Sequence, residues 1–143
     1  MRLAALLFGA VLTALTVSSA SAAVRITGDN GGQIGPYLEQ LMAIRGSGQQ
    51  VIIDGPCLSA CTLVLGVIPR ERICVTRRAR LGFHAAWHHG ENGRPATNRG
   101  GTQLLMAVYP PNVKNWISRR GGLTREMKYL SGSELASMYR SCR

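Results

Sequence analysis

The stretch DGPCLSACTLVLG, residues 54–66, decides the fold. It places one serine, Ser59, between two cysteines, Cys57 and Cys61. The β-branched run Val51–Ile53 just before it is typical of a strand buried on both faces. The apolar segment after it predicts a short helix with Ser59 near its N-terminus. A serine in that position is either a helix cap or a nucleophile supported by the free N–H groups of the helix.

Strand and helix signals alternate on both sides of this stretch. Strands are predicted at residues 24–27, 51–53, 73–75 and 80–85. Helices are predicted at residues 34–44, 59–66, 102–108 and 113–118, and from 131 or 133 to 139. Residues 88–101, with four glycines, a proline and two asparagines, predict a loop. The alternation predicts a single α/β domain, with a short sheet and crossover helices.

The N-terminus predicts export. Arg2 precedes the almost wholly apolar run 3–17, and Ala20-Ser21-Ala22 fits a signal-peptide cleavage site. We therefore expect a cleaved signal peptide at residues 1–22 and a mature domain at 23–143, in the periplasm or secreted. No later run approaches the roughly 18 apolar residues that a membrane-spanning helix needs, so no transmembrane segment is expected.

Four cysteines, Cys57, Cys61, Cys74 and Cys142, lie in the predicted mature chain. An even number in an exported chain favours two disulfides. Three pairings are possible, and the sequence does not rank them firmly. We favour Cys57–Cys61 with Cys74–Cys142, because the first pair lies across a turn.

The chain is strongly basic, with 17 Lys and Arg against 7 Asp and Glu and a formal net charge of +10. The basic residues are spread along the chain, and nucleic acid is not an expected partner of an exported protein. Attraction to an anionic envelope surface is one consequence of such a balance. A basic, solvated surface with no specific partner is the simpler interpretation.

The residues around Ser59 can be combined into a hydrolytic site. Serine catalysis needs a nucleophile in a fixed turn, a base, and N–H donors for the oxyanion. Ser59 is the candidate nucleophile and His84, in a strand-like segment, the candidate base. The oxyanion candidates are the N–H groups of Ala60 and of the turn Gly31-Gly32. Taken singly, each also has an ordinary structural interpretation: a cap, a core histidine or a glycine turn.

The histidines allow a second arrangement. His84 and His88 have the i, i+4 spacing that brings two ligands together on a helix, and with His89 they would form a three-histidine metal site to which Glu91 could add. Gly90 and Gly93 argue against a helix there. We therefore expect no metal and no cofactor.

Taken in order, these segments resemble the ClpP/crotonase superfamily, most closely its exported ClpP-like branch. Residues 28–32 resemble the family's oxyanion turn, residues 56–61 its cysteine-flanked nucleophile turn, and residues 81–84 the strand that carries its base. Residues 127–139 resemble its late turn and helix. The resemblance spans about residues 24–139, without the strands that normally precede the oxyanion strand, and so implies a truncated domain.

The resemblance also implies a function, with one departure. Met127 or Lys128 stands where the family has its catalytic acid; Glu126 is adjacent, while Asp29 and Asp54 fall in other elements. The implied activity is cleavage of peptide or ester bonds in a peptide or protein substrate. The alternative is a catalytically degenerate member that binds peptides or contributes to the envelope. Because a small sheet exposes its edges, the domain must be covered, charged at the edge, or form a homo-oligomer.

Overall fold

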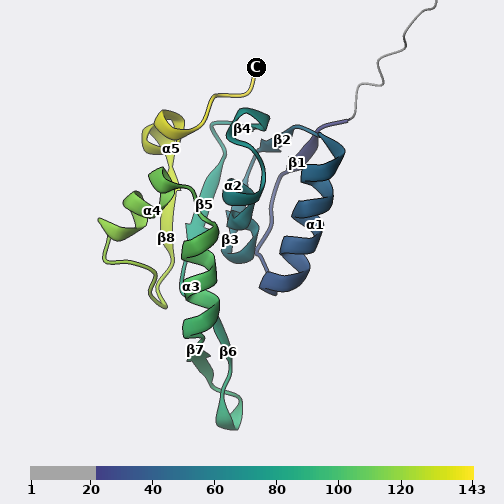
Figure 1. Cartoon of the computed structure of the whole chain (residues 1–143). Helices are drawn as coiled ribbons and strands as arrows, with labels where there is room; N and C mark the ends of the chain where they lie inside the picture. Colours follow the sequence, from purple (N-terminus) through teal and green to yellow (C-terminus); the bar gives the residue numbers. More distant parts are fainter. Residues whose placement is uncertain (1–21) are drawn as a thin grey trace, which may run out of the picture.

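The computed structural model describes residues 22–143 (Figure 1). The predicted signal peptide therefore lies outside the described residues, apart from Ala22. The described chain is mixed α/β, with five α-helices and several short strands, which confirms the predicted class. Within this part of the chain, no helix is both long and apolar enough to cross a membrane.

The first sheet is wholly parallel. Its order is β1 (Val24–Ile26), β2 (Val51–Ile53), β4 (Ile73–Val75). Helix α1 (Ile34–Ser47) connects β1 to β2, three residues longer at its C-terminus than predicted. The central strand is apolar on both faces because helices cover the sheet, as its β-branched run indicated.

A second sheet holds the strand of the candidate base. Its order is β3 (Pro56–Leu58), β5 (Arg80–Phe83), β8 (Lys128–Ser131), with β3 parallel and β8 antiparallel to β5. Neither β3 nor β8 was predicted. Pro56 lacks an N–H, but as the first residue of its strand it leaves the ladder intact.

The prediction of a loop over residues 88–101 is wrong. Strands β6 (Trp87–His89) and β7 (Pro95–Thr97) pair as an antiparallel hairpin, which extends below α3 in Figure 1. At the tip of the hairpin, Asn92 and Gly93 adopt positive φ angles of 63° and 70°, whereas Pro95 lies in β7 and Gly100 and Gly101 lie in α3. Helix α3 (Arg99–Val108) then begins three residues earlier than expected, with the Asn98 side chain accepting from the Gly101 N–H.

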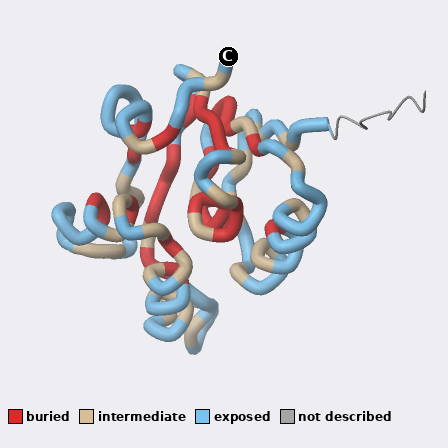
Figure 2. The backbone as a smooth tube through the Cα atoms, turned by 45° about the horizontal axis from the view of Figure 1, so that its top comes forward, coloured by how far each residue is buried: buried red, intermediate tan, exposed pale blue. Residues whose placement is uncertain are grey.

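The core is centred on the aromatic side chain of Phe83. Its ring packs edge-on against Tyr109, with centroids 5.4 Å apart, and lies 5.6 Å from that of Trp116 in α4 (Pro111–Ser118). All three side chains are buried. In Figure 2 the buried backbone gathers at the centre, while α1 is mostly exposed or intermediate. Burying such rings contributes about 2–3 kcal/mol each.

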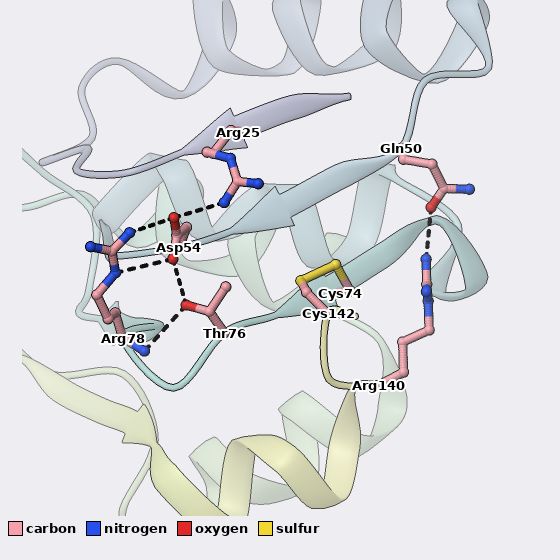
Figure 3. The surroundings of a disulfide bond; sticks show 8 residues. All are labelled: Arg25, Gln50, Asp54, Cys74, Thr76, Arg78, Arg140 and Cys142. Carbon is pink, nitrogen blue, oxygen red and sulfur yellow. Dashed lines mark hydrogen bonds and ion pairs between the residues drawn. A yellow bond between two sulfur atoms is a disulfide. The ribbon is translucent and has the colours of Figure 1, made fainter. Parts of the chain in front are cut away.

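The C-terminal tail covers one edge of the first sheet. After α5 (Gly132–Met138), Val75 of β4 donates to the Arg140 carbonyl and accepts from the Cys142 N–H, both at 3.0 Å. The disulfides are Cys57–Cys61 and Cys74–Cys142, the pairing that the sequence favoured. The second fixes the tail to β4, and Arg140 reaches Gln50 at 2.8 Å (Figure 3).

A buried carboxylate joins the segments beside this edge. Asp54 accepts from Arg25 at 2.8 Å, from Thr76 at 2.7 Å and from Arg78 at 2.6 and 3.1 Å (Figure 3). The hydrogen bonds from Arg78 and Thr76, then that from Arg25, hold the pKa of Asp54 well below its usual range. Asp54 is therefore engaged in structure, at the start of the segment that carries Ser59.

Candidate functional site

The predicted site residues line one cleft of about 640 Å³. It lies between the loop before α1, the 3-10 helix η1 (Ser59–Leu63), the end of β5, the hairpin and α3. None of its lining residues is Asp, Glu, Lys or Arg, in a chain that carries 17 basic residues. The lining residues are Asn30, Gly31, Gly32, Gln33, Ile34, Ser59, Ala60, His84, Ala86, Trp87, His88, His89, Asn98 and Leu105.

Ser59 is not a helix cap. Leu58 occupies the N-cap position of η1, with no side-chain capping bond, and Ser59 is the first residue of that helix. Its φ of 56° is positive, one of only two such angles at non-glycine residues in 22–143. A non-glycine residue in this conformation costs about 1–3 kcal/mol and persists only where the surroundings enforce it.

A disulfide and a threonine enforce the conformation of Ser59. The Cys57–Cys61 disulfide closes the turn around it, with both cysteines buried. The buried hydroxyl of Thr62 donates to the Ser59 carbonyl at 2.6 Å and also contacts the Tyr109 hydroxyl at 2.6 Å. The strained serine is therefore held by covalent and hydrogen-bonded contacts to the core.

Gly31 packs directly against this turn. A Cβ at Gly31 would lie 2.5 Å from the Leu58 carbonyl oxygen, 2.6 Å from the Ser59 Cβ and 2.8 Å from the Ala60 nitrogen. Its φ of 79° also favours glycine. The Gly31 N–H is already used, because it donates to Asp29 Oδ1 at 2.8 Å. Because Gly31 has no side chain, the Ser59 turn can pack directly against it. Its N–H donates to Asp29 and is not available to a ligand.

Asp29 is engaged in holding the glycine turn. The Tyr37 hydroxyl donates to the same Oδ1 at 2.5 Å. Burial, together with this bond to Asp29, raises the pKa of Tyr37 to about 12, so its hydroxyl remains a donor at neutral pH. Tyr37 and Asp29 therefore hold the Gly31 turn through hydrogen bonds, and neither residue lines the cleft.

Two of the three oxyanion candidates keep a backbone N–H that is free for a ligand. Within residues 22–143, the Gly32 N–H has no hydrogen-bond acceptor. The Ala60 N–H belongs to the first turn of η1, where no intrahelical acceptor exists. Both residues line the cleft beside Ser59. Of the three oxyanion candidates, Gly32 and Ala60 have free donors.

His84 follows β5 and is half-buried at the edge of the cleft. Its Nδ1 lies 2.7 Å from the Ala85 carbonyl oxygen. Because a carbonyl oxygen only accepts, Nδ1 carries the proton in this contact and Nε2 keeps a free lone pair. Ala85 is itself fixed, since it is buried and its N–H donates to the Thr124 carbonyl at 2.7 Å. A backbone carbonyl therefore sets the tautomer of His84.

Met127 and Lys128 occupy the two positions where the resemblance led us to expect an acid, and neither is one. Lys128 begins β8. It lies opposite Phe83 in the ladder between β5 and β8, and its Nζ donates to the Thr124 hydroxyl at 2.8 Å. Met127 packs near Gly82, and Glu126 is exposed. No carboxylate of the described chain lines the cleft.

The remaining histidines do not form a metal site. His88 and His89 lie on β6, a strand and not a helix, and the His89 ring packs edge-on against Trp87 at 5.3 Å. Among residues 22–143, no three His, Cys, Asp or Glu side chains are placed to hold a metal ion. The structure instead puts these rings on the wall of the cleft, a role that the loop prediction had not anticipated.

Comparison with protein-family models and with curated proteins finds no match.

Proposed function

We propose that the protein is a small exported ClpP/crotonase-like domain whose cleft cleaves peptide or ester bonds, with Ser59 as nucleophile and His84 as base. The observation that carries this proposal is the conformation of Ser59. A buried disulfide, a threonine and a glycine hold a strained serine in an uncharged cleft with His84 and two free N–H groups. Strain of this kind is concentrated at functional sites.

The proposed reaction follows serine acyl transfer. The Ser59 hydroxyl oxygen attacks the carbonyl carbon while its proton passes to His84 Nε2. The carbonyl oxygen, now negative, accepts from the N–H groups of Gly32 and Ala60. His84 returns the proton to the leaving amine or alcohol, and an acyl-serine ester forms. Water then attacks this ester, His84 takes a proton from the water, and the acid is released with Ser59 restored.

The Ala85 carbonyl would perform one of the two functions that the acid has in a catalytic triad. An acid in a catalytic triad sets the histidine tautomer and stabilises the imidazolium that forms. The Ala85 carbonyl oxygen sets the tautomer through the 2.7 Å contact with Nδ1, but it carries no full negative charge. We therefore expect slow turnover and a preference for activated esters over amides.

The substrate is proposed to be neutral around the scissile bond, because no Asp, Glu, Lys or Arg lines the cleft. A peptide or protein is the proposed substrate class. The basic surface outside the cleft is a proposed contact for anionic envelope components. A homo-oligomer is proposed through the edge strand β1 or β8, since the C-terminal tail pairs with β4.

A second candidate function is binding without cleavage. It is favoured by the absence of a carboxylate among the residues that line the cleft. In that case the disulfide-braced turn would hold a carbonyl group of a bound peptide at Gly32 and Ala60 with no acyl transfer.

Labelling with a fluorophosphonate probe tests the proposal. The oxidised protein should be labelled at Ser59, and His84→Ala should slow labelling at least tenfold. Ser59→Ala should abolish it, whereas the exposed Ser133→Ala, a matched serine in α5, should not. No labelling of folded, oxidised protein would exclude the hydrolase and leave peptide binding as the function of the cleft.

A further inference from the structure

Trp87 is the exposed aromatic residue of the cleft. Its exposed fraction is 50%, against 1% for Trp116, the other tryptophan. Of the large apolar side chains that are exposed within residues 22–143, only Trp87 lines the cleft. The His89 ring stands at 87° to the indole, and an edge-on neighbour covers at most one face of it. The cleft therefore presents an apolar ring face to a ligand.

The backbone that carries Trp87 is held on both sides. Ala86, the residue before it, donates to the Thr102 hydroxyl at 3.0 Å and accepts from the Asn98 N–H at 2.8 Å. Trp87 itself begins the paired part of the hairpin. It follows His84 by three residues, which places the two Cα atoms at most about 11 Å apart. The indole is thus fixed close to the proposed base.

Side-chain amides share the cleft with this indole. Asn30, Gln33 and Asn98 line it, whereas no Asp, Glu, Lys or Arg does. An amide both donates and accepts hydrogen bonds. The Asn98 side chain makes one hydrogen bond within residues 22–143, in which its Oδ1 accepts from the Gly101 N–H. Its NH2 group therefore remains for a ligand, beside the backbone of Trp87.

An indole face next to amides matches a sugar better than other ligands. A sugar ring has an apolar C–H face that can lie on an indole, and hydroxyls at its edge that donate and accept. An aromatic side chain would use the indole but leave the amides unpaired, and a charged ligand would meet no opposite charge. The cleft volume of about 640 Å³ is within the range of about 300–1,000 Å³ that is typical of small-molecule sites.

We propose that the Trp87 side of the cleft is a subsite for a neutral sugar ring, which stacks on the indole and bonds to the Asn98 amide. The sugar belongs to the substrate of the proposed hydrolase, so this assignment rests on that function, whereas sugar binding itself does not. The substrate carries the ring either as the alcohol part of an ester or as a glycan on a peptide, which share this chemistry.

Tryptophan fluorescence of the oxidised full chain measures the binding. The probes are two neutral trisaccharides, triacetylchitotriose and maltotriose. Because Trp116 is buried, protection from quenching by acrylamide reports on Trp87. At least one trisaccharide should bind saturably. Sorbitol, which has hydroxyls but no ring, and N-acetylphenylalaninamide, which has a ring but no hydroxyls, should bind at least tenfold more weakly.

Three results of this titration would overturn the proposal. The first is that neither trisaccharide binds. The second is that sorbitol binds as tightly as the trisaccharides, since the ring face would then be unimportant. The third is tighter binding of N-acetylphenylalaninamide, which would assign the indole to an aromatic side chain of a peptide.

Variants studied by isothermal titration assign the contacts. Trp87→Ala should weaken trisaccharide binding about tenfold, and Trp87→Phe, which keeps a smaller ring, should weaken it less. Asn98→Asp keeps the oxygen that caps α3 but loses the NH2 donor, so binding should weaken about fivefold with an unchanged melting temperature. The control Tyr129→Ala, an exposed aromatic residue outside the cleft lining, should bind as the wild type does. Unchanged affinity in Trp87→Ala would contradict the proposal.

The fluorophosphonate probe separates this inference from the proposed hydrolase. A bound trisaccharide should slow the labelling of Ser59, because both lie in the same cleft. Labelling of Ser59 without any sugar binding would keep the hydrolase and overturn the subsite. Sugar binding without labelling would exclude the hydrolase and leave a cleft that binds saccharides.

Two substrates distinguish the sources of the sugar. Hydrolysis of O-acetylated N-acetylglucosamine, at least tenfold slower in Trp87→Ala, would identify a sugar ester. The second substrate is a neutral tripeptide with N-acetylglucosamine on its central serine, and faster cleavage of it than of the bare tripeptide would identify a glycan on a peptide. If neither substrate is cleaved by protein that does label at Ser59, the link between the sugar and the hydrolase is refuted.

Discussion

The two disulfides differ in what they constrain. Cys57 and Cys61 are four residues apart and surround Ser59 in the cleft. Cys74 and Cys142 are 68 residues apart and fix the C-terminal tail to β4, away from the cleft lining. In the chain-entropy model a disulfide that closes a loop of this longer length stabilises by about 4 kcal/mol, and one that closes the shorter loop by about 2 kcal/mol. The crosslink that contributes more to stability is thus the one farther from the site.

Removal of the long-range disulfide should have the largest effect on stability. We expect Cys74→Ala/Cys142→Ala to lower the free energy of unfolding by about 4 kcal/mol, because the unfolded chain regains the entropy of a long loop. Urea denaturation followed by circular dichroism measures this. The protein that remains folded should still label at Ser59. Loss of labelling in the folded fraction would show that the tail, too, supports the cleft.

Gly31→Ala should damage the Ser59 turn without touching either disulfide. The new Cβ would overlap the Leu58 carbonyl and the Ser59 side chain, and the positive φ adds strain. We expect a loss of about 3 kcal/mol in unfolding free energy and no probe labelling. Gly28→Ala is the matched control, since a Cβ there meets nothing within 4 Å. Normal labelling of Gly31→Ala would mean that the close packing is unimportant for the site.

Removal of the short-range disulfide should affect the site more than the fold. We expect Cys57→Ala/Cys61→Ala to lower the unfolding free energy by about 2 kcal/mol. Labelling should slow about tenfold, because Ser59 is freer to leave its strained conformation. Rates are measured under conditions where the variant is fully folded. An unchanged rate would show that Thr62 and Gly31 alone hold the serine.

Loss of the Asp54 carboxylate should give the smallest change in unfolding free energy, and the change should depend on pH. The pKa of Asp54 is lowered in the folded state, so its ion pairs stabilise the protein above the unfolded pKa of about 3.9. That contribution is lost as the pH falls toward the lower folded value. Asp54→Asn should therefore be less stable than the wild type near pH 6, and the difference should shrink toward about pH 3. A constant difference would assign the effect to packing instead of charge.

The sequence predicted those parts of the fold that rest on local patterns. The strand Val51–Ile53 and the start of α1 at Ile34 follow from apolar runs and helical spacing, and the structure has both. Strands β3 and β8 were missed because each exists through pairing with β5, which is distant in sequence.

The sequence predicted residues that share one cleft, but not their geometry. Ser59 and His84 both line that cleft, and their roles as nucleophile and base stay predictions. Residue type cannot reveal that Ser59 has a positive φ, that the Gly31 N–H is taken by Asp29, or that the Ala85 carbonyl holds the histidine. Each depends on backbone geometry set by neighbouring segments. Catalysis itself stays a prediction.

The spacing of the cysteines along the chain also sets the order in which the two disulfides can form. In an oxidising compartment Cys57 and Cys61 can meet as soon as their own turn has emerged, since short loops close within microseconds. Cys74 must wait until Cys142 has been made, and synthesis adds only about 5–20 residues per second. During that interval the turn around Ser59 can be crosslinked before the β4 edge is covered. Early closure of the short loop would also remove both thiols with which Cys142 could mispair, those of Cys57 and Cys61.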